Sequence, residues 1–122
     1  MTMNNIRHFY EAMQSLIDSH YFRTLLDDVG GLAGDMALFK SEDSTADPAI
    51  WDDWEDAIKK IKGSDIVPET LTVEEGYEAA LIFFNFEADL RSSKDLIKFI
   101  ETITYEKWLE AVEAVEKDES LN

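Results

Sequence analysis

Hydrophobic residues recur at intervals of three and four along most of this chain, a spacing typical of amphipathic helices with one buried face. Alternating β-branched runs of strand length are missing, although residues 100–105 could be extended. The pattern therefore predicts an all-α fold, a compact bundle of about six helices. The predicted helices cover residues 5–22, 24–39, 48–60, 73–91, 94–102 and 105–117.

Residues that suit helix starts precede four of these segments. Thr72 begins a Thr-x-x-Glu sequence with capping-box spacing. Asp47 precedes Pro48, which suits the first helical position because its missing N–H has no partner there. Ser93 and Thr104 are suitable N-caps for the fifth and sixth helices. The second predicted helix is the weakest, because its three glycines cost on the order of 2–3 kcal/mol relative to alanine.

The chain contains an apparent internal repeat. Residues 10–36 align without a gap with residues 77–103, and residues 54–61 align with residues 108–115. The alignment predicts two three-helix units, with chance similarity between amphipathic helices as the alternative. The two units are residues 5–61 and 72–117, within a single domain of residues 1–122.

The chain is strongly acidic: 27 Asp and Glu against 11 Lys and Arg give a formal net charge of −16. Such a charge repels nucleic acid and anionic lipid and attracts cationic partners.

The lack of cysteine excludes disulfides and thiolate chemistry and fits a reducing compartment. No apolar run approaches the ~18 residues of a membrane span. We therefore expect a cytoplasmic binding protein with a basic protein partner and no direct contact with nucleic acid or membrane; the oligomeric state is open.

Candidate catalytic and metal-binding groups are few. His8 and His20 are flanked by aromatic residues, which favours structural roles. Neither histidine follows a glutamate by three residues, as di-iron bundles require. The acidic stretch 43–54 resembles a calcium loop, but Pro48 replaces the required glycine and Trp54 replaces the bidentate glutamate. We expect no enzyme activity, no cofactor and no metal site.

Acidic and large aromatic residues alternate around the third predicted helix. Trp54 aligns with Trp108, so it is predicted to lie in the core. Trp51 aligns with no second tryptophan, so we expect it to be a partly exposed anchor of the kind that dominates binding energy. A second run of acids, at residues 106–119, is interpreted as a solvated helix face. The predicted partner-binding residues are Asp43, Asp47, Trp51, Asp52, Asp53, Glu55 and Asp56.

Three segments resemble small bacterial immunity proteins of contact-dependent growth inhibition systems. The segments are LTVEEGYEAA at residues 71–80, DDVGGLAGDM at 27–36 and ADPAIWDDW at 46–54. This chain differs from the family pattern in dividing these parts between two copies. The resemblance implies a cytoplasmic protein that binds the C-terminal toxin domain of a cognate effector and blocks its active site or its access to substrate.

Such toxins are often nucleases, which are basic because they hold a phosphate backbone. The charge of −16 suits such a partner independently of the resemblance. The alternative hypothesis is an acidic nucleic-acid mimic that inhibits a DNA-processing enzyme. A mimic would compete with DNA and act without a dedicated partner, whereas an immunity protein is selective for one toxin.

Overall fold

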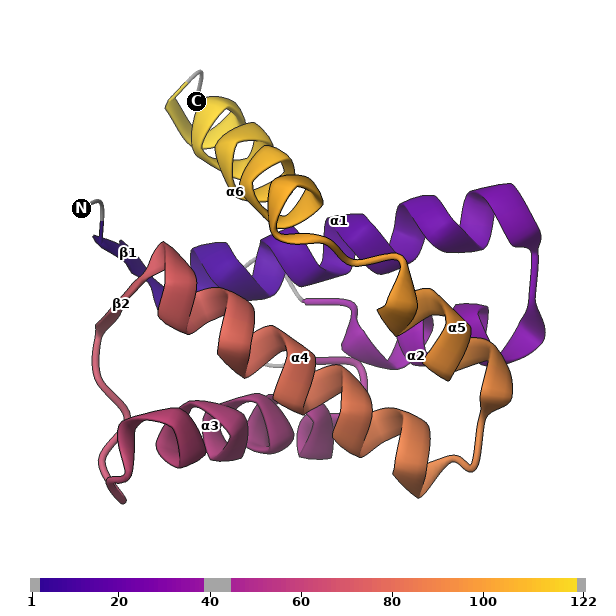
Figure 1. Cartoon of the computed structure of the whole chain (residues 1–122), viewed down its shortest axis with the longest axis horizontal. Helices are drawn as coiled ribbons and strands as arrows, with labels where there is room; N and C mark the ends of the chain where they lie inside the picture. Colours follow the sequence, from indigo (N-terminus) through magenta and orange to yellow (C-terminus); the bar gives the residue numbers. More distant parts are fainter. Residues whose placement is uncertain (1–2, 39–44, 121–122) are drawn as a thin grey trace.

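The computed structural model describes residues 3–38 and 45–120 and shows a compact all-α fold, as predicted. Figure 1 shows the two short strands at one end of the molecule and α2 and α5 at the other. None of the helices described is long and apolar enough to cross a membrane. The elements are β1 (Met3–Asn5), α1 (Ile6–Thr24), α2 (Asp27–Met36), α3 (Pro48–Lys62), β2 (Thr70–Thr72), α4 (Val73–Leu90), α5 (Lys94–Glu101) and α6 (Tyr105–Ser120).

The predicted helix starts are confirmed by their caps. The side chain of Asp47 accepts a hydrogen bond from the Ala49 amide at 3.1 Å. Thr72 and Glu75 form the complete capping box, with bonds of 2.9 and 3.1 Å. Ser93 and Thr104 each accept a bond from the amide three residues ahead. These bonds satisfy donors that the first turn of a helix leaves unpaired. The glycine-rich α2 is short, at 10 residues.

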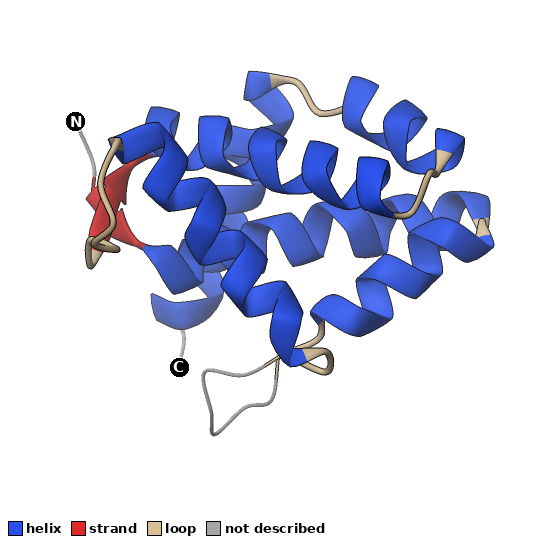
Figure 2. Ribbon diagram, turned by 90° about the horizontal axis from the view of Figure 1, so that it is seen from below, coloured by secondary structure: helices blue, strands red, loops and turns tan. Residues whose placement is uncertain are grey.

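The strand pair was not predicted. β1 and β2 are antiparallel, and Asn4 lies opposite Leu71 at the centre of the ladder. The pairing ties the start of α1 to the start of α4, at the edge of the bundle shown in Figure 2. Residues 100–105, which could have been extended, instead form the end of α5, a short connection and the start of α6.

The two long central helices pack against most of the others: α1 against three helices and α4 against four. α1 contacts α6 and α2 most extensively, while α4 contacts α3 and α5. α1 and α4 also meet each other, as do α2 and α5. The largest side chains that are fully buried between these helices are Trp54, Trp108, Tyr10, Phe9, Phe83, Phe84 and Phe99.

Aligned tyrosines of the two predicted units make the same bond. The Tyr10 hydroxyl donates to the Met36 carbonyl at 2.6 Å. The Tyr77 hydroxyl donates to the Ile103 carbonyl at 3.0 Å, again across 26 residues of chain. In the alignment Tyr10 pairs with Tyr77 and Met36 with Ile103. Each bond ties the first helix of a unit to the end of its second helix.

Aligned tryptophans also make the same bond. The indole N–H of Trp54 donates to the Ile6 carbonyl at 3.2 Å, and that of Trp108 donates to the Val73 carbonyl at 3.0 Å. Ile6 and Val73 are the first residues of α1 and α4. The two units thus have equivalent internal contacts, while their common origin by duplication stays a prediction.

A residue in the left-handed conformation follows the first helix of each unit: Leu25, the C-cap of α1, with φ 55°, and Ser92, just beyond the C-cap of α4, with φ 51°. An L-residue with a side chain pays about 1–2 kcal/mol in this region, and glycine does not. Leu25 is also 66% exposed. We therefore expect Leu25→Gly to raise the free energy of unfolding by about 1 kcal/mol, measured by urea denaturation.

The neighbouring Leu26 provides the control. It has φ −73° and packs partly against the core, so Leu26→Gly should destabilise the protein. Equal losses from both substitutions would contradict the strain assigned to Leu25.

Candidate functional site

The predicted partner-binding residues that the structure describes lie on or beside α3. Asp52 and Asp56 are exposed, whereas Asp53 and Glu55 are half-buried. The Asp47 carboxylate is engaged as the N-cap. Asp43 lies outside the described residues. Of the acids, Asp52 and Asp56 present their carboxylates most fully to solvent.

Trp51 is half-buried, and its ring centroid lies 5.1 Å from that of Tyr10. Trp54 is fully buried, as predicted. Tyr105, which aligns with Trp51 in the second unit, lies in an equivalent arrangement, with its ring centroid 5.3 Å from that of Tyr77. Packing on a tyrosine therefore accounts for part of the role of Trp51, and only its exposed part is available to a partner.

The charge of α3 changes sign along its length. Lys59, Lys60 and Lys62 occupy the last turn, where cations interact favourably with the helix dipole. The Lys62 ammonium lies 2.7 Å from the Glu75 carboxylate at the start of α4. This pairing and the Thr72 amide lower the pKa of Glu75. The acidic surface of α3 is thus limited to the part of the helix before Lys59.

A groove of about 280 Å³ runs between α3 and α4. Asp53 and Asp56 line it from the α3 side, with Lys60 one turn further on. Ile82, Phe83 and Phe86 line it from the α4 side. Carboxylates and an apolar wall therefore meet in one concave surface, which suits recognition of a group with a charged end and an apolar body. We call this concave surface the acidic groove.

Behind the acidic groove lies a buried carboxyl group, Glu87 on α4, with no solvent exposure. Its Oε2 accepts a hydrogen bond from the Arg91 Nε at 3.4 Å, and the Arg91 Nη2 also binds the Asp35 carboxylate at 2.9 Å. Its Oε1 receives no hydrogen bond from the described residues. Burial, and then the nearby Asp53 carboxyl, raise the pKa of Glu87 to about 7 against the opposing effect of Arg91.

Two carboxyl groups in contact can form a hydrogen bond only when one of them holds a proton. Glu87, the more buried of the two, holds that proton, and Asp53 is the acceptor. Asp53 therefore belongs both to the acidic groove and to a buried polar network that joins α2, α3 and α4. The network also raises the pKa of the buried Tyr10 hydroxyl, chiefly through desolvation and secondarily through the charge of Glu87.

Sequence reasoning overlooked Glu87, although a signal was present. Glu87 follows Phe83 by four positions and Phe84 by three, so it lies on the apolar face of the helix. An acid at such a position must be paired or protonated, because a buried isolated charge is expensive. Arg91 follows Glu87 by four positions and could have been identified from spacing, whereas Asp53 on α3 and Asp35 on α2, which binds Arg91, come from other helices and could not.

Comparisons with protein-family models, with curated protein sequences and with solved structures found no match.

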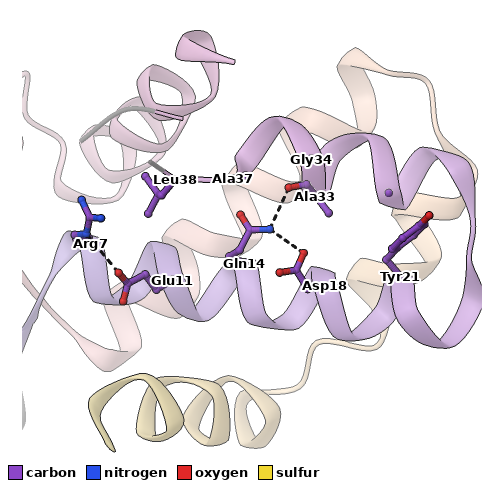
Figure 3. Close-up of a pocket in the computed structure, with 10 residues that line it drawn as sticks. Arg7, Glu11, Gln14, Asp18, Tyr21, Ala33, Gly34, Ala37 and Leu38 are labelled. Atoms are coloured by element: carbon purple, nitrogen blue, oxygen red, sulfur yellow. Dashed lines mark hydrogen bonds and ion pairs between the residues drawn. The ribbon is translucent and has the colours of Figure 1, made fainter. Parts of the chain in front are cut away.

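A second and larger groove, of about 560 Å³, lies between α1 and α2 (Figure 3). The Gln14 amide nitrogen donates to the Asp18 carboxylate at 2.9 Å and to the Ala33 carbonyl at 3.1 Å. Arg7 and Glu11 pair with each other at 3.4 Å. The charged groups drawn in Figure 3 thus interact chiefly within α1, and the α2 side offers mainly small residues. We place the candidate site at the acidic groove.

His20 is nine-tenths buried, and its ring centroid lies 5.0 Å from that of Phe99. Burial lowers the pKa of His20, and the charges of Arg23 and Lys107 lower it further. Across residues 3–38 and 45–120, no group of three or more His, Cys, Asp or Glu side chains is arranged to hold a metal ion.

Proposed function

We propose that this chain is an immunity-type inhibitor, which binds a basic toxin domain and occludes its functional surface. The observation that supports this most directly is a net charge of −16 together with exposed carboxylates on α3 beside a groove with an apolar wall. Opposite charges steer the partners together, and the apolar wall and Trp51 contribute desolvated contact area. The resemblance to contact-dependent growth inhibition immunity proteins supports a cognate toxin domain, with a nuclease as the favoured class and the cytoplasm as the site of action.

Charge complementarity has a kinetic advantage for such an inhibitor. Steered association reaches about 10⁸ to 10⁹ M⁻¹ s⁻¹ at low salt, compared with about 10⁵ to 10⁶ M⁻¹ s⁻¹ without steering. An inhibitor that must capture a toxin before it acts benefits from this difference. The buried centre of the interface then determines how slowly the complex dissociates.

The first test is a pull-down of tagged protein from its native lysate, washed at low and at high salt, with mass spectrometry of the retained proteins. We expect one basic toxin fragment that survives the high-salt wash. Several DNA-processing enzymes, all lost at high salt and displaced by DNA, would overturn this proposal in favour of the nucleic-acid mimic.

Charge reversal then locates the interface. Asp52→Lys combined with Asp56→Lys should weaken binding of the captured partner by about 2 kcal/mol or more, because both exposed carboxylates become repulsive. Glu106→Lys combined with Glu110→Lys makes the same change in net charge on exposed residues of α6 that align with them. Titration calorimetry should show a much smaller loss for the α6 pair. Equal losses would mean that net charge matters and the α3 surface does not.

A further inference from the structure

Two carboxyl groups at the acidic groove, Asp53 and Glu87, have no acidic equivalent in the other unit. The equivalent space in the other unit lies between α6 and α1 and measures about 320 Å³. There Lys107 takes the aligned position of Asp53, and the buried His20 takes that of Glu87. The groove of the other unit thus has a lysine and a histidine with a lowered pKa where the acidic groove has two carboxyl groups. The pair Asp53 and Glu87 is therefore a property of one groove and not of the packing that the two units share.

The pair also places a buried proton beside the acidic groove. Glu87 is fully buried, and its Oε1 receives no hydrogen bond from the part of the chain described. Arg91 contacts only the other oxygen of Glu87 and shares its guanidinium with Asp35. Oε1 is therefore the oxygen that carries the proton donated to Asp53, so a cation that binds Asp53 acts directly on this proton.

The walls of the acidic groove indicate what kind of donor fits. Asp53 and Asp56 provide negative charge along α3, and Lys60 stands at the far end, one turn beyond Asp56. Ile82, Phe83 and the half-exposed Phe86 form the opposite wall. A guanidinium binds carboxylates through paired hydrogen bonds and stacks on aromatic rings, and its alkyl stem packs on apolar surface.

We propose that the acidic groove receives a cationic side chain of the basic protein partner, most favourably an arginine, with Asp53 and Asp56 binding its charge. Ile82, Phe83 and Phe86 contact its stem. This site depends on the proposed function for the identity of the partner, but the groove's preference for a guanidinium can be tested without that partner.

Binding at Asp53 has a consequence for Glu87. A cation beside Asp53 favours the ionised form of the neighbouring carboxyl group, so the proton held by Glu87 is released on binding. Affinity therefore rises as the pH increases through the titration of Glu87. The charged and titratable groups that act on Glu87 are Tyr10 from α1, Asp35 from α2, Asp53 from α3 and Arg91 from its own helix.

The probe is N-acetyl-arginine amide, and N-acetyl-citrulline amide is its uncharged equivalent of nearly the same shape. In NMR titrations of the full chain we expect saturable shifts at residues of the acidic groove with the arginine probe only. The carboxyl ¹³C signal of Glu87 should report a lower pKa when the probe is bound.

Asp53→Asn should weaken probe binding roughly tenfold or more, since it removes the charge and keeps the shape. Glu110→Gln, at the aligned position of Asp56 in the other groove, should have no effect on it. Shifts that spread over the acidic surface without saturation, equal binding of the citrulline probe, or an unchanged Glu87 pKa would overturn the assignment. None of these outcomes affects the pull-down result. A groove that does not bind arginine can therefore be distinguished from a chain that does not bind a toxin.

Discussion

The free energy of unfolding is expected to increase by roughly 2–3 kcal/mol as the pH falls from about 8 to about 5, because folded Glu87 takes up a proton. Its pKa of about 7 in the folded protein lies above the ordinary value of 4.5, so between these values the folded state binds more protons than the unfolded state. This contribution is fully present below pH 4.5 and is lost as the pH rises through 7. Urea denaturation at several pH values measures it.

Glu87→Gln provides the control. An amide can donate to Asp53 and accept from Arg91 without a proton that titrates. The variant should be more stable than the native protein at pH 8 by about 2 kcal/mol, and this advantage should shrink toward pH 5. His20 acts in the opposite direction, because its lowered pKa favours protonation of the unfolded state. The difference between variant and native protein at each pH removes that effect. A pH-independent difference would show that Glu87 does not hold a proton near neutrality.

Gly76→Ala is expected to destabilise the protein by about 2 kcal/mol, although alanine is the better residue in a helix interior by about 1 kcal/mol. A Cβ at this position would lie 2.9 Å from two ring carbons of Phe9. Phe9 is fully buried and stacks on Trp108 with the centroids 5.7 Å apart, so it has little room to move. Thermal or urea unfolding measures the loss.

Gly31→Ala is the matched control in another helix interior. A Cβ there meets no atom within 4 Å, so this substitution should stabilise the protein by about 0.5–1 kcal/mol. Phe9→Leu should relieve part of the loss caused by Gly76→Ala, which would appear as a coupling energy between the two sites. If Gly76→Ala and Gly31→Ala prove equally stabilising, the contact with Phe9 is not restrictive.

The contact between Phe9 and Gly76 also explains a difference between the two units. These residues align with each other, and they meet where α1 and α4 approach. Two large residues could not both occupy that place, so one unit has phenylalanine and the other glycine. Residues at the contact between the units must therefore differ even where the rest of the alignment is similar.

Helix content, helix starts and the burial of Trp54 could be predicted from the sequence. The caps at Asp47, Thr72, Ser93 and Thr104 act within three residues, and Trp54 was identified as a core residue by its alignment with Trp108. A cap involves residues that are close together in the chain, and the repeat is found by comparing two segments directly, so neither requires the tertiary structure. The resemblance to immunity proteins and the partner-binding role of α3 stay predictions.

Features that join distant segments became visible only in the folded molecule. The ladder between β1 and β2, the packing of Trp51 on Tyr10, and the carboxyl pair of Asp53 and Glu87 each depend on how separate segments meet. Apolar spacing determines that one face of a helix is buried. It does not determine which other helix covers that face, because many pairings of amphipathic helices bury a similar area. Tertiary packing decided that Asp53 contacts Glu87 at the wall of the acidic groove while Asp52 and Asp56 are exposed, and so how each of these acids can meet a partner.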